Sequence, residues 1–355
     1  MDQSMVASSV AINTRQVGWL RGLSFDAIYI FGILGAALVS GWFVITNPGL
    51  FPAIFVLNGW LLGYHHVIST FTRLTFDKES FSEHRFFIVW LPLIVLAAVV
   101  VAWAIFGSWV LTTAYLYWQW WHYTRQSYGI SRIYSRKASL PINNSLTNLT
   151  VYALPVWGIL YRSYQAPDKY LFTDVKVLPV PFWLVAAAGA FALAVTISWI
   201  KEQLHAYSQG RLPVAHTLYM CSHLTVFGVG YLLISDINYG WLVLNIWHNC
   251  QYILTVWMFN NNRFKNQIDA RHRFLSYISQ RKNLAIYFAV CLAISTVSYK
   301  MLATTLGWVS SLAIFGSLPL FAIAYQAINF HHYVVDAAIW KVRKKSLRQN
   351  LGIAN

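Results

Sequence analysis

Ten apolar stretches, each long enough to cross a bilayer as a helix, follow one another along the chain. A hydrocarbon core about 30 Å thick needs about 20 apolar residues per helix. Only 10% of the residues are charged, against about a quarter in a typical soluble domain. We therefore predict an all-α fold, a polytopic integral membrane helix bundle of about ten transmembrane helices. The stretches are 25–46, 50–72, 86–106, 108–131, 147–164, 179–200, 213–234, 239–260, 285–305 and 308–340.

The polar ends of the chain set the domain organisation. We expect one transmembrane domain at 25–340, preceded by a cytoplasmic segment at 1–24 and followed by a basic cytoplasmic tail at 341–355. The last apolar stretch is too long for one crossing and contains Pro319. Proline removes a backbone donor and clashes with the preceding turn, so Pro319 should kink this stretch or separate an interfacial piece from it.

The basic residues fall mainly on one side of these spans. If the N-terminus is cytoplasmic, 22 of the 26 Lys and Arg residues are cytoplasmic. This asymmetry predicts that both termini are cytoplasmic. It also accounts for most of the net charge of +15 without nucleic acid, and the basic loop 261–282 is expected to face water and touch anionic lipid. We expect an integral protein of a bacterial plasma membrane, with membrane lipids and not nucleic acid as partners.

Six histidines lie at similar depth in four of the predicted spans, all of which run from the outside to the cytoplasm. Ionisable groups at membrane depth are costly, so they suggest a functional site. Neutral imidazole is a common ligand of iron, copper and zinc. We therefore predict these six histidines as metal ligands: His65, His66, His122, His248, His331 and His332.

Two further charged residues are candidates for catalysis. Asp336 follows His332 by four residues and so shares its helix face. It is expected to bind the metal or to orient His332. Arg125 lies one turn after His122 and is expected either to pair with Asp336 or an anionic substrate, or to reach the interface. Gln126 and Tyr252 stand four residues after His122 and His248, respectively.

The remaining histidines have simpler interpretations. A single histidine in a membrane helix is often a buried hydrogen-bonding group between helices. We favour that role for His223 and a structural role for His216 near an interface. The histidines of loops and interfaces are expected at the surface: His84, His205 and His272.

A histidine cluster near the cytoplasmic face resembles the membrane di-iron oxygenases and desaturases. Their hallmark is one H-x(3,4)-H box and two H-x-x-H-H boxes. This chain instead has bare pairs at His65-His66 and His331-His332, with His122 and His248 standing alone. The dispersed pattern also resembles the multi-span carotene-cleaving retinal synthases. These resemblances imply iron, two ions by analogy, and oxygen chemistry on an apolar substrate.

Three functions fit the sequence. We favour a membrane oxidoreductase, similar to an oxygenase or desaturase, that acts on a hydrocarbon, fatty acyl chain or isoprenoid. Its electron donor would be a separate protein, since the chain has no nucleotide-binding fingerprint. The alternatives are a proton-coupled transporter with a histidine relay, and an electron-transfer protein that binds quinone or holds haem through two axial histidines.

Overall fold

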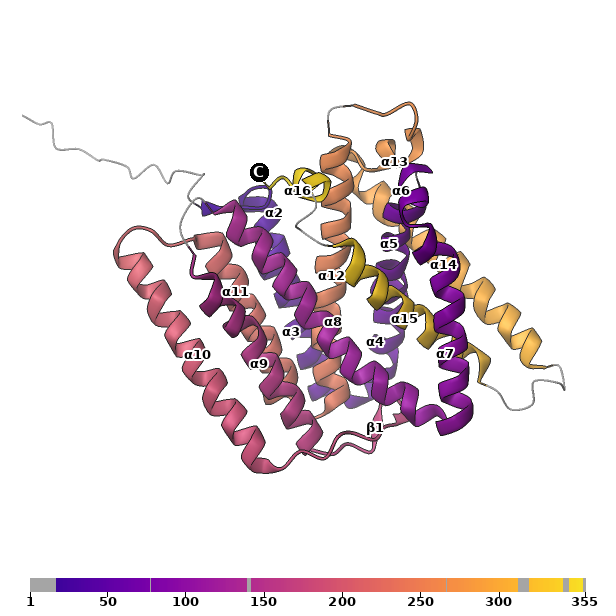
Figure 1. The fold of residues 1–355 in the computed structure, drawn as a ribbon, viewed down its shortest axis with the longest axis horizontal. Helices are drawn as coiled ribbons and strands as arrows, with labels where there is room; N and C mark the ends of the chain where they lie inside the picture. The colour runs from indigo at the N-terminus through magenta and orange to yellow at the C-terminus, as the bar shows by residue number, and fades with distance from the viewer. Residues whose placement is uncertain are drawn as a thin grey trace, which may run out of the picture.

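The structure, a computed structural model, describes residues 17–76, 78–138, 142–265, 267–311, 319–340 and 345–353. This part of the chain is helical apart from one small antiparallel hairpin, in which Lys169 pairs with Asp174 and Tyr170 with Thr173. The prediction of an all-α fold is thus confirmed. Figure 1 shows the helices packed into one bundle, with the hairpin at one end and α6, α13 and α16 at the other.

The elements of the first half are α2 (Leu23–Ala27), η1 (Ile28–Gly32), α3 (Ile33–Thr46), η2 (Pro48–Leu50), α4 (Phe51–Asn58), η3 (Gly59–Tyr64), α5 (His65–Thr75), α6 (Lys78–Glu83), η4 (Phe86–Trp90), α7 (Leu91–Phe106), α8 (Ser108–Lys137) and α9 (Asn144–Tyr164). The hairpin strands are β1 (Lys169–Tyr170) and β2 (Thr173–Asp174). The second half contains α10 (Phe182–Ser208), α11 (Val214–Gly228), η5 (Val229–Leu233), α12 (Ile237–Arg263), α13 (Arg273–Ile278), η6 (Arg281–Asn283), α14 (Leu284–Ser310), α15 (Leu320–Ile339) and α16 (Lys345–Asn350).

Five helical runs in the described residues are long and apolar enough to cross a membrane. They correspond to five of the ten predicted spans. The helices α8, α12 and α15 are not among them, and their many polar side chains face the interior of the bundle. The ten crossings and their orientation stay a prediction. The five runs are Leu23–Thr46, Pro48–Thr75, Phe86–Phe106, Phe182–Ser208 and Arg281–Ser310.

The boundary predicted for the last span is wrong. Residues 308–310 belong to α14, and α15 begins at Leu320, directly after Pro319. The stretch is therefore broken and not one kinked helix, since a proline is tolerated where a helix starts but not inside it. That the proline separates an interfacial piece stays a prediction. Residues 312–318 lie outside the described residues, as do 1–16 of the N-terminal segment and 341–344, 354 and 355 of the tail.

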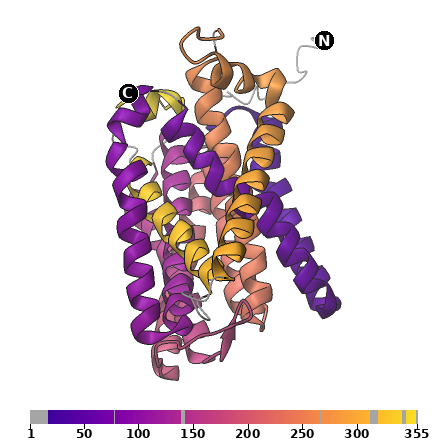
Figure 2. The same cartoon turned by 90° about the vertical axis from the view of Figure 1, so that its right-hand side faces the viewer.

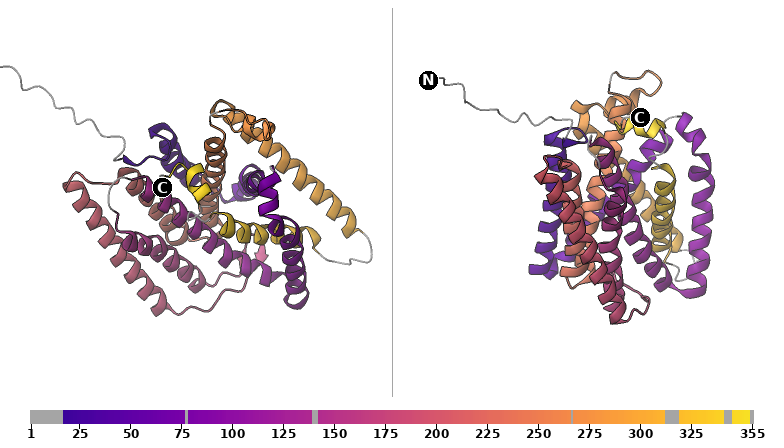
Figure 3. Two further views of the ribbon diagram at one scale, coloured as in Figure 1. Left: turned by 45° about the horizontal axis from the view of Figure 1, so that its top comes forward. Right: turned by 60° about the vertical axis from the view of Figure 1, so that its left-hand side comes forward.

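Helix α12 forms the centre of the bundle and is buried along most of its length. It packs against α3, α5, α8 and α11. Figure 1 and the two views of Figure 3 show α9, α10 and α11 on one side of α8 and α12, and α5, α7, α14 and α15 on the other. Polar side chains on α8 and α12 therefore point into the protein and not into lipid, which places a polar site at the junction of the two groups.

The N-terminal end of α12 packs unusually closely against η5. Gly230 of η5 and Gly240 of α12 approach so closely that a Cβ on Gly240 would overlap the carbonyl oxygen of Gly230. Arg162 of α9 is buried there and donates hydrogen bonds to the carbonyls of Gly230, Ile234 and Ser235. The turn between η5 and α12 thus has its backbone acceptors satisfied inside the protein, as burial requires.

Candidate metal centre

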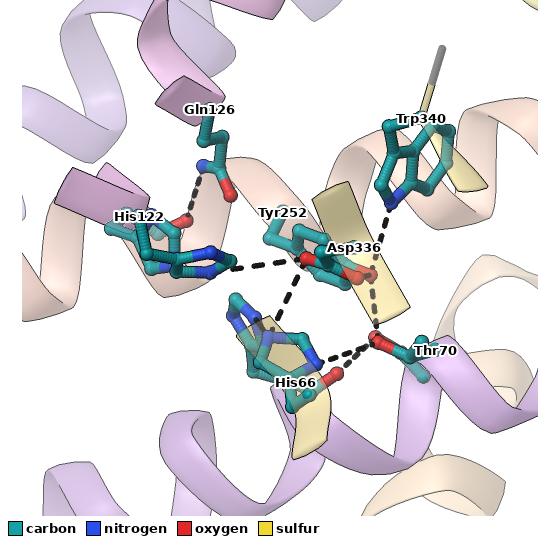
Figure 4. A network of polar contacts seen from close by, with 10 residues as sticks. His66, Thr70, His122, Gln126, Tyr252, Asp336 and Trp340 are labelled. Carbon is teal, nitrogen blue, oxygen red and sulfur yellow. Dashed lines mark hydrogen bonds and ion pairs between the residues drawn. The ribbon is translucent and has the colours of Figure 1, made fainter. Parts of the chain in front are cut away.

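Three helices bring three histidines and one carboxylate into a single buried group. His66 comes from α5, His122 from α8, and His332 and Asp336 from α15. One ligand atom of each lies within 4.8 Å of the others. All four side chains are buried. Figure 4 shows His66, His122 and Asp336 pointing toward one another. Sequence positions up to 270 residues apart therefore converge on one point, as the shared depth of the histidines predicted.

The distances show that these side chains face one another. Nε2 of His66 lies 2.7 Å from Nε2 of His332. Oδ2 of Asp336 lies 3.5 Å from Nε2 of His332 and 3.8 Å from Nε2 of His122. His332 and Asp336 share one face of α15, as their spacing of four residues predicted. The carboxylate thus points one oxygen toward two imidazoles.

His248 of α12 lies against this group. The centre of its ring is 4.8 Å from the ring of His66 and 4.8 Å from the ring of His122. Its Nδ1 atom is buried and has no hydrogen-bond partner in the described part of the chain. His248 is therefore a neighbour of the four-residue group.

Two ring nitrogens of the four-residue group also lack a hydrogen-bond partner in the described part of the chain. Nε2 of His122 and Nδ1 of His66 are buried without a hydrogen-bond partner among the described residues. Buried polar atoms nearly always have a partner, and an exception calls for an ion, a water molecule or another ligand. Three imidazoles and a carboxylate form a donor set that suits iron, zinc and related transition metals. The residues present thus fit a transition-metal ion, whose identity the donor set leaves open.

A hydrogen-bonded network fixes the donors. The hydroxyl of Tyr252 donates to Oδ1 of Asp336 at 2.6 Å and lies 2.7 Å from the hydroxyl of Thr70. Thr70 in turn lies 3.3 Å from Nδ1 of His332, and the indole of Trp340 donates to Tyr252 at 3.2 Å. Figure 4 shows Trp340, Tyr252 and Thr70 linked beside Asp336 and the histidines. Such contacts set the tautomer and orientation of metal ligands and tune their affinity.

The supporting residues share one sequence spacing. Thr70, Gln126, Tyr252 and Trp340 each stand four residues after a site residue on the same helix, namely after His66, His122, His248 and Asp336. Residues four apart lie one turn apart on one face of a helix. The sequence analysis noted this spacing for Gln126 and Tyr252, but it missed Thr70 and Trp340. The repeated spacing was the signal that would have found them.

A stacked cation, Arg73, lies beside Trp340 at the end of α15. Arg73 is 9% exposed and donates a hydrogen bond of 2.9 Å to the carbonyl of Ile339 near the end of α15. Its guanidinium lies 4.2 Å from the ring centre of Trp340 and 4.7 Å from that of Phe259. A cation is favourable at a helix C-terminus and over an indole face. Arg73 therefore holds Trp340 over Tyr252.

The segment before the first histidine pair has a wide helical turn. The π-helical segment η3 ends at Tyr64, and α5 begins at His65. A π-helical turn rotates the side chains that follow it and is frequent at functional sites. This local geometry aims His66 at the bundle interior.

A small cavity of about 50 Å³ lies beside the ligand atoms. That volume has room for a few molecules the size of water. Its walls include His66, His122, His248 and His332, together with Asn245 and other polar and aromatic side chains. The protein therefore has space for small molecules directly beside the candidate metal centre.

The first histidine of each adjacent pair, His65 or His331, points away from the group. The ring of His65 packs on Phe288, with ring centres 5.4 Å apart. Nε2 of His331 lies 2.7 Å from the carbonyl oxygen of Phe87. Adjacent helical residues point about 100° apart, so the structure brings one histidine of each pair into the group and leaves the other outside it.

Arg125 faces α9. Its guanidinium is hydrogen-bonded to the hydroxyl of Tyr152 and lies 4.9 Å from the ring centre of Tyr128. The side chain is exposed. The described structure thus places Arg125 with α9 instead of with Asp336, and a catalytic role for it stays a prediction.

The other histidines have separate surroundings. Nδ1 of His223 lies 2.7 Å from the hydroxyl of Ser127, and Nε2 of His216 lies 3.2 Å from that of Ser131. These contacts between α11 and α8 confirm a hydrogen-bonding role between helices. The prediction that His84 lies at the surface is wrong, because its side chain is buried and Nδ1 contacts the carbonyl of Ser80 at 2.9 Å.

The sequence matches no protein-family model, and no curated protein and no solved structure matches the chain. The site must be interpreted from its own geometry.

Proposed function

We propose that this chain is an integral membrane oxidoreductase that holds iron at the group formed by His66, His122, His332 and Asp336 and acts on a lipid-soluble substrate. The observation that carries the proposal is the convergence of three imidazoles and one carboxylate in the interior of the helix bundle, with buried ring nitrogens that have no hydrogen-bond partner among the described residues. Histidine and carboxylate ligation with room for further ligands is typical of non-haem iron sites that use dioxygen. Bound iron would supply one-electron chemistry and oxygen activation.

The chain's own residues would position this chemistry. Oδ2 of Asp336 is available to the ion while Oδ1 is held by Tyr252. Thr70 contacts Nδ1 of His332, which leaves Nε2 directed into the group. Rigid, hydrogen-bonded ligands keep the productive geometry without reorganisation. The small cavity beside them admits dioxygen-sized molecules and little bulk water.

The resemblance to di-iron enzymes suggested two ions. The four converging atoms provide for one ion, since three or four protein ligands are usual at a catalytic metal. A second ion would draw on His248, whose Nδ1 is buried and unpaired in the described part of the chain. Metal analysis of the purified protein measures the number of ions per chain.

We further propose ten crossings with both termini in the cytoplasm of a bacterial cell. The five apolar helices and the 22 of 26 basic residues on one predicted side support this orientation. Trp340 and Arg73 then mark the cytoplasmic side of the site, where a separate electron-donor protein would approach.

Adjacent histidines provide a matched test by metal analysis of detergent-purified protein. We expect about one to two irons per wild-type chain, loss of iron in His66→Ala and in His332→Ala, and retention in His65→Ala and in His331→Ala. The paired variants change the same residue type one position apart. Absence of any transition metal from wild type purified without oxygen and without chelators would refute the proposal.

One observation favours a proton relay as the second candidate. The contact of 2.7 Å between His66 and His332 is also a hydrogen-bond distance, and a hydrogen-bonded chain runs from His332 through Thr70 and Tyr252 to Asp336. Metal-free protein that moves protons together with a solute across proteoliposomes, and that loses this flux in His332→Ala, would establish the relay in place of the oxidoreductase.

A further inference from the structure

A second and larger cavity lies next to the histidine cavity. Its volume is about 380 Å³, within the range of about 300–1,000 Å³ typical of ligand pockets. It lies between α5, α7, α14 and α15, and Figure 2 shows α15 between α7 and α14. The lining residues are mostly aliphatic or aromatic: Val67, Ile68, Phe71, Pro92, Leu96, Ser298, Tyr299, Leu302, Ala324, Ala327, Ile328 and His331.

The two cavities share a wall. Val67 and Tyr299 line both of them. Val67 directly follows His66 in the sequence. The ring of Tyr299 stacks on Tyr64, with centres 3.8 Å apart and planes 9° apart, and Tyr64 also lines the histidine cavity. A molecule in the larger cavity would therefore be separated from the metal ligands by one layer of side chains.

The larger cavity is on the lipid-facing side of the bundle. Helices α7 and α14 belong to the apolar, little-buried runs. Large side chains such as Leu93 and Ile94 on α7 and Val297 and Met301 on α14 are exposed. In a membrane these surfaces contact hydrocarbon, so a molecule dissolved in the bilayer reaches the helices that enclose the cavity without crossing water.

The residues that line the larger cavity favour a hydrocarbon ligand over a charged one. Among the residues that the structure describes, no Asp, Glu, Lys or Arg lines the cavity. The polar ring of His331 is already engaged, since Nε2 contacts the carbonyl of Phe87 at 2.7 Å, and Phe71 lies nearly parallel to it with ring centres 6.1 Å apart. Ala324 and Ala327 leave the space on α15 that larger residues would fill. A charged head group would find no partner there, whereas apolar carbon would be well accommodated.

We propose that this cavity binds one hydrocarbon chain that enters from the bilayer, and that Tyr299 and Val67 separate the chain from the candidate metal centre. The binding stands on the geometry of the cavity alone. That the bound chain is the substrate rests on the proposed function. The chain can be acyl or isoprenoid, because both present the same apolar surface to these walls.

Photolabelling tests this inference. The probe is palmitic acid with a diazirine in the middle of its chain, bound to purified wild-type protein and irradiated, with labelled peptides found by mass spectrometry. We expect labels on residues that line the cavity. Ala324→Trp fills the cavity and should reduce labelling about tenfold. Ala322→Trp is the matched control, because Ala322 is exposed on the same helix, and it should label as wild type does.

A second pair of variants covers the case in which Ala324→Trp fails to fold. Leu302→Trp blocks the cavity from α14, and Met301→Trp adds the same ring on the exposed side of that helix. Unlabelled palmitic acid and unlabelled phytol are competitors in separate arms, and the stronger competitor identifies the acyl or isoprenoid source. Equal labelling in a blocking variant and its control, or no competition by either compound, would overturn the inference.

The outcome is distinct from that of the metal test. Labelling needs no metal, so the metal-deficient variant His332→Ala should still be labelled in the cavity. Cavity-specific labelling of a protein that holds no metal would refute the oxidoreductase and keep the chain-binding site. A protein that binds iron but is labelled only at random on its outer surface would refute the chain-binding site and keep the oxidoreductase proposal.

Discussion

The hydroxyl of Tyr252 donates a hydrogen bond of 2.6 Å to Oδ1 of Asp336, while Oδ2 of that carboxylate faces His332 at 3.5 Å and His122 at 3.8 Å. One oxygen is held by the protein and the other is directed at the histidines. A carboxylate fixed in this way is ready to bind an ion, because its orientation needs no adjustment when the ion arrives.

Tyr252→Phe should weaken metal binding. The substitution removes the hydroxyl that holds Asp336 and contacts Thr70, and loss of such a partner typically lowers metal affinity about 10- to 100-fold. Titration with a competing chelator measures the change. Tyr29→Phe is the control, since it removes another buried hydroxyl, paired with Thr255 at 2.8 Å, and should leave metal affinity as in wild type. Equal affinities in the two variants would contradict the assigned role.

Metal removal should destabilise the protein. A ligand that binds only the folded state stabilises it by about 2.7 kcal/mol at 100 times its Kd. Unfolding in detergent, followed by intrinsic tryptophan fluorescence, should therefore begin at a lower temperature after chelation and recover when ferrous iron is restored without oxygen. His332→Ala should show no such response, whereas His331→Ala should respond as wild type does. A wild-type curve insensitive to chelator and iron would argue against a metal in this group.

The positions of the histidines along their helices allowed the sequence to place the site, but their directions needed the structure. His66, His122, His248 and His332 meet because their spans carry them to one depth. Which histidine of each pair faces the group could not be predicted, because both members of each pair are buried and only the packing of the neighbouring helices distinguishes them. His65 packs on Phe288, and His331 contacts the carbonyl of Phe87.

The fold, like the site, could be predicted only in part from the sequence. The apolar runs predicted the helices well, since a membrane helix must be long and apolar. A kink or break at Pro319 was expected, yet the boundary at 308 was misplaced because the apolar run hides the end of α14 at Ser310. The supporting role of Trp340 was missed because an aromatic residue beside basic ones is typical of a membrane interface. Only the packing of α15 on α12 shows its contact with Tyr252.

Arg73→Leu should loosen the side of the site formed by Trp340 and the end of α15. It removes the donor to the carbonyl of Ile339 and the cation over Trp340. A lost hydrogen bond from a charged group costs about 1.5–3 kcal/mol, and we also expect faster release of metal to a chelator. Arg21→Leu is the control, because Arg21 likewise stacks on a tryptophan, Trp257, at 4.7 Å. That control should lose stability while its rate of metal release stays that of wild type. Equal rates of metal release in the two variants would contradict the role assigned to Arg73 at the site.

Gly240→Ala should disrupt the packing that positions α12, and with it His248 and Tyr252. A Cβ at this position would overlap the carbonyl oxygen of Gly230 and lie 2.9 Å from Nη2 of Arg162. Backbone cannot move aside as a flexible side chain can, so we expect a loss of about 1–3 kcal/mol or more. Gly35→Ala is the matched control, because an added Cβ there meets no atom within 4 Å. It should be neutral or slightly stabilising, since alanine favours helix more than glycine does. Thermal unfolding of the two variants in the same detergent measures the difference, and equal midpoints would show that α9, η5 and α12 are not packed as described.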